Sequence, residues 1–139
     1  MSIKSVLGFD YGERRIGIAI GQTISQSASP LITLNAINQK PDWNSIEKLI
    51  TEWKPDALIV GIPRYLDGND SDMTEKAQRF CRQLEGRFKL PVYTVNESLS
   101  SQEAEQRLKQ TRKIGQHNKH EIDKMAAAII VQRWLEQNP

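Results

Sequence analysis

The chain alternates between short apolar runs of strand length and longer segments in which apolar residues recur with helical spacing. The first two runs, Ile3 to Asp10 and Ile16 to Gly21, are joined by a short segment that contains glycine, and this pattern predicts a β-hairpin. A third extended segment is expected at Pro30 to Leu34. Ala57 to Ile62 is a continuous apolar run, typical of a strand covered on both faces, and Leu90 to Val95 is expected to be another buried strand.

Helical segments separate and follow these runs. Asp42 and Asn44 are candidate N-caps for the first helix, which Pro55 ends, and Ser100 with Glu103 forms a capping-box pattern. The expected helices cover Ile46 to Trp53, Asp72 to Phe88, Ser100 to Thr111 and a last segment from near His120 to Leu135. This order of elements indicates a single α/β domain over residues 1–139, with a mixed central sheet of about five strands flanked by helices.

Composition excludes several classes of protein. The 139 residues hold 19 Lys and Arg against 17 Asp and Glu, and a net charge of +2 excludes a polybasic protein whose whole surface grips nucleic acid. The longest apolar run, Met125 to Val131, is far shorter than the ~20 residues that span a bilayer, and no signal-like segment develops before Asp10. The single cysteine, Cys81, allows neither an internal disulfide nor a cysteine-based zinc site. We therefore expect a cytoplasmic protein without a membrane segment.

Three carboxylates occupy positions where an α/β fold places chemistry. Asp10 closes the first strand, Glu97 follows the strand that ends near Val95, and Asp123 is expected in the first turn of the last helix. Ligand sites in open α/β sheets lie at the carboxyl ends of parallel strands. Carboxylates that converge there without basic partners repel one another unless a divalent cation lies between them, and Mg²⁺ prefers such oxygen ligands. Two ions ~4 Å apart would activate a water and stabilise the leaving oxygen of a phosphodiester.

Each of these acids also has a purely structural interpretation. Asp10 would be a turn-forming cap, Glu97 a solvated loop acid, and Asp123 a first-turn acid favoured by the helix dipole. The residue types and their spacing leave both interpretations open.

Four ordered motifs that together span nearly the whole chain resemble a known bacterial family. It is the family of pre-16S rRNA nucleases, earlier described as Holliday-junction resolvases. The matching stretches are Leu7 to Gly12 with Arg14 to Ala19, Val60 to Pro63 with Asp67-Gly68, Asn96 to Ser101, and Ile122-Asp123 with Ala126 to Ala128.

The resemblance implies an RNase H-like fold and a nuclease that depends on Mg²⁺ or Mn²⁺, with two ions. Asp10, Glu97 and Asp123 match the catalytic, metal-binding acids of the family. The implied substrate is precursor rRNA, cleaved near the 5′ end of 16S rRNA during ribosome biogenesis, with branched DNA as the alternative. Asn96 and Ser98 stand where the family usually has Asp and Arg, so a supporting acid and a phosphate-facing cation are absent. No sequence signal decides between a monomer and a homodimer.

Basic residues near the acids are candidates for substrate binding. Arg14 and Arg15 lie in the first hairpin, where a guanidinium would contact a phosphate bidentately. Residues 107–124 hold six Lys or Arg against two acids, and they include Arg112, Lys113 and Lys119. This strip would hold nucleic acid beside the metals, or simply be a solvated loop, and a non-catalytic nucleic-acid-binding module would use it too.

For Cys81 and the two histidines we expect neither nucleophilic catalysis nor metal binding. Cys81 falls within an amphipathic helix, so we expect a small core residue rather than a nucleophile. His117 and His120 lack a nearby third metal ligand in the sequence, so phosphate contact or solvation is expected for them.

The basic strip gives a first testable prediction. Replacing Arg112 and Lys113 by Ala should weaken nucleic-acid binding across sequences and flatten the dependence of log affinity on log salt by up to ~2, because each neutralised phosphate contributes about 0.7–0.9 to that slope. The catalytic step at saturating substrate should change less. Titrations at several salt concentrations test this, and parallel slopes with equal affinities would show that the strip only faces solvent.

Overall fold

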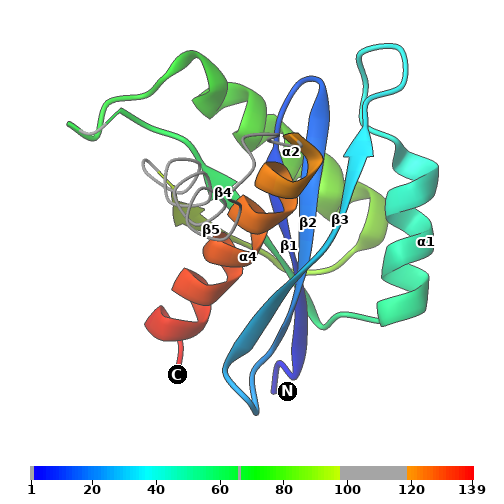
Figure 1. Ribbon diagram of the computed structural model, residues 1–139, viewed down its shortest axis with the longest axis vertical. Coiled ribbons are helices and arrows are strands. Elements are labelled where there is room, and N and C mark those ends of the chain that lie inside the picture. Colours follow the sequence, from blue (N-terminus) through cyan, green and yellow to red (C-terminus); the bar gives the residue numbers. More distant parts are fainter. Residues whose placement is uncertain (1, 66, 98–118) are drawn as a thin grey trace, which may run out of the picture.

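The computed structural model describes residues 2–65, 67–97 and 119–139, and they build a five-stranded sheet (Figure 1). Its order is β3-β2-β1-β4-β5. The first three strands form an antiparallel meander, whereas β4 and β5 run parallel to β1. The predicted mixed sheet is therefore confirmed. The strands are β1 (Ser5–Tyr11), β2 (Arg15–Gln22), β3 (Ser27–Asn35), β4 (Ala57–Ile62) and β5 (Val92–Asn96).

Helices cover both faces of this sheet. The described helices are α1 (Trp43–Trp53), α2 (Asp72–Phe88) and α4 (Lys119–Gln137). α1 and α2 pack on one face around Phe9, Ile46 and Phe80, and α4 packs on the other around Ile59 and Val131 (Figure 1). All six residues of β4 are buried, as expected for a strand between two helical layers. The helix expected at Ser100 to Thr111 lies outside the described residues.

Local capping explains where the helices begin. The Asp42 side chain accepts a hydrogen bond from the Ser45 backbone N–H at 3.2 Å, so Asp42 rather than Asn44 is the N-cap of α1. α1 consequently starts at Trp43, three residues before the predicted start. The α2 prediction is confirmed at both ends, and a reciprocal capping box between Ser71 and Thr74 fixes its start.

Four of the five strands differ from the prediction at their ends. β1 is Ser5–Tyr11 rather than Ile3 to Asp10, and β2 is Arg15–Gln22 rather than Ile16 to Gly21. β3 extends over Ser27–Asn35 instead of Pro30 to Leu34, because it pairs with β2 along the full length of that strand. β5 begins at Val92 rather than Leu90, and Pro91 before it has no N–H to donate to a neighbouring strand.

Glycines let α4 approach the sheet backbone directly. A Cβ built at Gly8 of β1 or Gly21 of β2 would overlap the Val131 side chain. One built at Gly17 of β2 would overlap the backbone carbonyl of Asp123. The three glycines face α4, so the helix comes close to the backbone of β1 and β2 at these positions.

This packing predicts opposite effects for two Gly→Ala substitutions. Gly17→Ala should destabilise the protein by about 1–3 kcal/mol or more, because α4 must move away to admit the methyl group. Gly86→Ala should stabilise it by about 0.4–1 kcal/mol, since Gly86 lies in α2 and a Cβ there meets nothing within 4 Å. Denaturant unfolding of both variants measures the difference. Equal stabilities for the two variants would contradict the proposed close packing of α4.

Candidate active site

The carboxyl ends of β1, β4 and β5 meet the start of α4, and the three candidate acids lie there. Asp10 is in β1 and pairs with Gly17 of β2. Because residues directly opposite in an antiparallel pair share a face, and Gly17 faces α4, Asp10 points to the α4 side. Glu97 directly follows β5, and its backbone N–H donates to the Ile62 carbonyl of β4 at 3.2 Å.

Gly61 of β4 provides the space for the Glu97 carboxylate. A Cβ at Gly61 would lie 2.9 Å from Glu97 Cδ and 2.5 Å from Ile130 Cδ1 of α4. The Glu97 side chain is therefore enclosed between the sheet and α4, and the residue is only 7% exposed. Glu97 is therefore not the solvated loop acid of the purely structural interpretation.

Asp10 and Glu97 form a close pair of carboxyl groups. The pKa of Asp10 is raised well above its ordinary value, first by desolvation and then by the negative charges of Glu97 and Asp123. A hydrogen bond with Glu97 raises the pKa of Asp10 further, because a proton shared between two carboxyls favours the neutral form. Glu97 and Asp123 thus both act electrostatically on Asp10.

Asp123 is paired with a cation. Its Oδ2 accepts a hydrogen bond from Arg15 Nε at 2.7 Å, and each side chain is about a quarter exposed, at 22% and 26%. No pattern in the sequence indicates this partner, which lies 108 positions away along the chain. The sequence predicts Asp123 in the first turn of the last helix, and this prediction is wrong. α4 begins at Lys119, and its first-turn acid is Glu121.

The edge strand β3 holds the start of α4. The Thr33 hydroxyl donates to the His120 carbonyl, and His120 Nε2 lies 2.9 Å from Asn35 Oδ1. These contacts fix the end of the helix that carries Asp123. His120, for which phosphate contact or solvation is expected from the sequence, also contacts Asn35 of β3 in the structure.

The remaining sequence candidates lie apart from the acids or outside the described ranges. Arg14 is exposed in the β1–β2 turn, and its carbonyl accepts from the Ala36 N–H at 2.8 Å. Lys119 is exposed at the first residue of α4. Arg112 and Lys113 fall outside the described residues. Cys81 is buried in the core, and burial raises the pKa of its thiol to about 11, which leaves it protonated at neutral pH.

The carboxylates of Asp10, Glu97 and Asp123 would have to rearrange to hold a divalent cation together. In the described ranges, no three His, Cys, Asp or Glu side chains are gathered as a ready set of metal ligands. The reason is local, because Asp123 is directed to Arg15 while Asp10 and Glu97 share a hydrogen bond. The three carboxylates are nonetheless the hard oxygen donors that Mg²⁺ prefers. A cation would replace the shared proton and relieve the repulsion.

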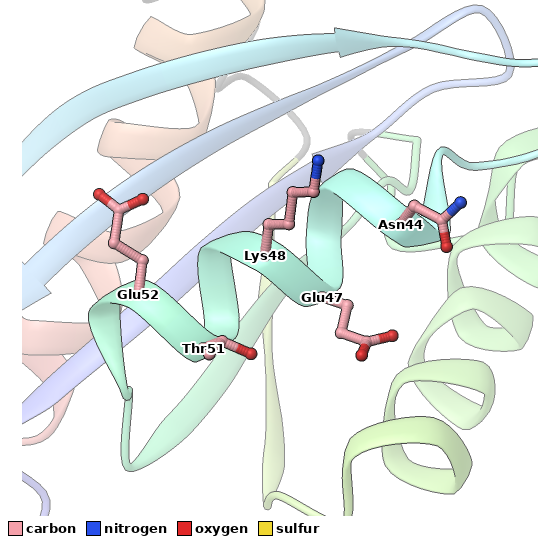
Figure 2. Close-up of a pocket in the computed structure, with 5 residues that line it drawn as sticks. All are labelled: Asn44, Glu47, Lys48, Thr51 and Glu52. Atoms are coloured by element: carbon pink, nitrogen blue, oxygen red, sulfur yellow. The ribbon is translucent and has the colours of Figure 1, made fainter.

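A surface depression on α1 is not part of this site. One lies on the outer face of α1, lined by Asn44, Glu47, Lys48, Thr51 and Glu52 (Figure 2). All five residues are exposed, and Figure 2 shows them as side chains of a single helix. α1 covers the face of the sheet opposite α4, so this depression is separate from the three acids.

Comparisons with solved structures identify the class of fold. RuvC of Thermus thermophilus in complex with a Holliday junction superposes with a TM-score of 0.57 at 15% identity, over 96% of this chain and 94% of that chain. The fowlpox virus resolvase in complex with Holliday junction DNA gives 0.57 at 14% identity, over 96% and 97%. The fold is that of the RuvC-like, RNase H-fold resolvases.

Sequence comparisons then identify the family. The chain matches the family model "RuvX: Holliday junction resolvase" over residues 4–137. A curated relative from Pseudomonas fluorescens is 47% identical over 99% of this chain and 96% of its own length, and one from Pseudomonas putida is 47% identical over 98% and 97%. Both carry the name "Putative pre-16S rRNA nuclease". The chain belongs to the RuvX family, which confirms the resemblance found in its motifs, and it is a nuclease.

The raised pKa of Asp10 predicts a pH-dependent stability. In the absence of metal, folding opposes ionisation of Asp10, so the wild type loses stability as pH rises from the ordinary pKa of 3.8 through the raised value. Asp10→Asn removes this penalty, which amounts to about 1.4 kcal/mol for each tenfold weakening of the acid in the folded state. We expect the variant to melt at a higher temperature than the wild type at pH 7, and the difference to vanish below about pH 4. Thermal melts with chelator across this range test it, and a gap that is constant with pH would contradict it.

Proposed function

We propose that this protein cleaves phosphodiester bonds of precursor 16S rRNA near its 5′ end, with Asp10, Glu97 and Asp123 as its catalytic, metal-binding acids. The observation that supports these residues most is the pairing of Asp10 with the buried Glu97, in which desolvation and the charges of Glu97 and Asp123 raise the pKa of Asp10. A cluster of mutually repelling acids is costly for folding, and pKa values perturbed in this way are typical of functional sites.

Asp10, Glu97 and Asp123 would hold Mg²⁺ or Mn²⁺, two ions in all. When bound, the cations supply an activated water and stabilise the leaving oxygen. The protein contributes the negative charge and the enclosure: Gly61 and Ile130 surround Glu97, and the Gly17 contact keeps α4 close to β2, next to Asp10. Asp10 and Glu97 would have to lose their shared proton to hold a cation, so metal affinity should rise with pH.

Arg15 would have two roles in this proposed function. Its Nε holds Asp123, which leaves four guanidinium N–H donors for other groups. A phosphate that approaches the acids would accept from these donors, so Arg15 would position the substrate and Asp123 together. Arg14 is exposed on the same hairpin and would contact the adjacent backbone phosphate.

The substrate assignment rests on the names of the relatives that match nearly the whole chain. No helix in the described part of the chain is long and apolar enough to cross a membrane. An rRNA precursor and the single buried thiol of Cys81 both fit a reducing cytoplasm.

Branched DNA is the second candidate, because the family model carries the description of a Holliday junction resolvase. Symmetric cleavage of a four-way junction needs two sites related by a two-fold axis. A homodimer would therefore favour this reaction, whereas a monomer is sufficient for cleavage of an RNA strand. Parallel assays on precursor rRNA and a four-way junction, with the oligomeric state measured under the same conditions, separate the two.

The acids are tested by cleavage of labelled precursor rRNA. Asp10→Asn, Glu97→Gln and Asp123→Asn should each lower the rate by at least about 100-fold, since even partners of metal ligands cost 10–100-fold when mutated. Chelation of the metal should abolish cleavage in the wild type. Cys81→Ser is the control and should cleave at the wild-type rate. Full activity in any of the three acid variants would exclude that residue from the metal site.

A further inference from the structure

A basic groove lies on the face of the sheet opposite the three acids, between α2 and the segment that leads into α1. Its volume is about 420 Å³, within the range of sites that hold small ligands. The cations that line it are Lys40, Lys76, Arg79 and Arg87, and one acid, Glu13, also borders it. We refer to this site as the basic groove.

Most of the positive charge in the basic groove is uncompensated. Lys76 Nζ lies 2.9 Å from Glu13, and that pairing raises the pKa of Lys76. Lys40, Arg79 and Arg87 have no carboxylate within ion-pair distance among the residues that the structure describes. All of these cations are exposed, so they are free to reach an anionic ligand. The groove thus attracts anions although the whole chain carries a net charge of only +2.

The aromatic lining favours phosphate over bases as the group bound. The Arg87 guanidinium lies 4.2 Å from the centroid of the Trp43 ring, and the Phe80 ring stacks with Trp43 at 5.6 Å and 24°. Trp43 is therefore engaged with two neighbours and is a poor platform for a nucleobase. A guanidinium that rests on an aromatic face keeps its N–H donors in its own plane and is pre-organised for the oxygens of a phosphate.

The basic groove is adjacent to the site of cleavage along the chain. Tyr11, which lines it, directly follows Asp10 in β1. Successive side chains of a strand point to opposite faces, so the two sites lie on either side of the same strand end. Arg14 is exposed in the turn that continues from this end. A substrate strand that leaves the acids and passes over this turn would enter the groove.

We propose that the basic groove binds backbone phosphates of the substrate strand that flanks the cleaved bond, independently of base sequence. The proposal rests on the nuclease function proposed above and adds a second contact region on the far side of β1. The groove has room for a nucleotide-sized segment, so a single strand rather than a double helix would occupy it.

The test compares two double variants of matched charge. Lys40→Ala with Arg79→Ala removes two cations from the groove. Lys48→Ala with Arg82→Ala removes two exposed cations from α1 and α2 that do not line it. Binding of a single-stranded RNA oligonucleotide is measured in chelator, so that no cleavage is required. We expect the groove variant to bind at least about tenfold more weakly, with a salt slope smaller by up to ~1.4, because each lost phosphate contact on a single strand removes about 0.7.

The control variant should bind nearly as the wild type does, and thermal melts should show both variants folded. With Mg²⁺ added, the groove variant should have a raised KM and an unchanged kcat, because its residues do not touch the reacting atoms. Equal affinities and equal slopes for the groove and control variants would overturn the proposal. If the groove variant loses affinity and slope while the wild type cleaves no RNA, the groove is supported and the proposed cleavage of precursor rRNA is wrong.

Discussion

The contact between α4 and bare sheet backbone is the constraint on which the site depends. Gly17 pairs with Asp10 in the sheet and touches the carbonyl of Asp123 in the helix. The separation of the strand acid from the helix acid is therefore set by main-chain contact, which is stiffer than contact through side chains. The Gly8 and Gly21 contacts with Val131 extend the same arrangement two turns along α4. A substitution that moves α4 away from the sheet would therefore also change the distance between Asp10 and Asp123.

That contact gathers negative charge around Asp10. Asp123 pairs with Arg15, but its charge and that of Glu97 still raise the pKa of Asp10. The shared proton of the Asp10–Glu97 pair reduces this charge when no cation is bound. A divalent ion offers the same compensation without the proton. Enclosure by the sheet and helix lowers the local dielectric, and this strengthens the interaction of the carboxylates with a proton and with a cation alike.

Local patterns in the sequence are enough to predict the sheet and two of the acids. Asp10 and Glu97 terminate apolar runs, and the rule for the carboxyl ends of parallel strands brings such residues together. Asp123 is recognisable from its motif, but the contacts that His120 of the same helix makes with Thr33 and Asn35 of a distant strand are not. The Arg15–Asp123 pair spans 108 positions and has no local signature. Long-range polar contacts of this kind follow from the completed fold.

The order of the elements has a consequence during protein synthesis. The hairpin that supplies Asp10 and Arg15 leaves the ribosome early, whereas α4 emerges among the last elements described. Domains fold only when the segments that complete their core are present, and the α4 face of the sheet has no cover from that helix before then. Asp123 therefore reaches Arg15 only after all the other described elements have been translated. A chain that stopped before α4 would lack one of the three proposed catalytic acids, so the proposed site can form only once that helix has been synthesised.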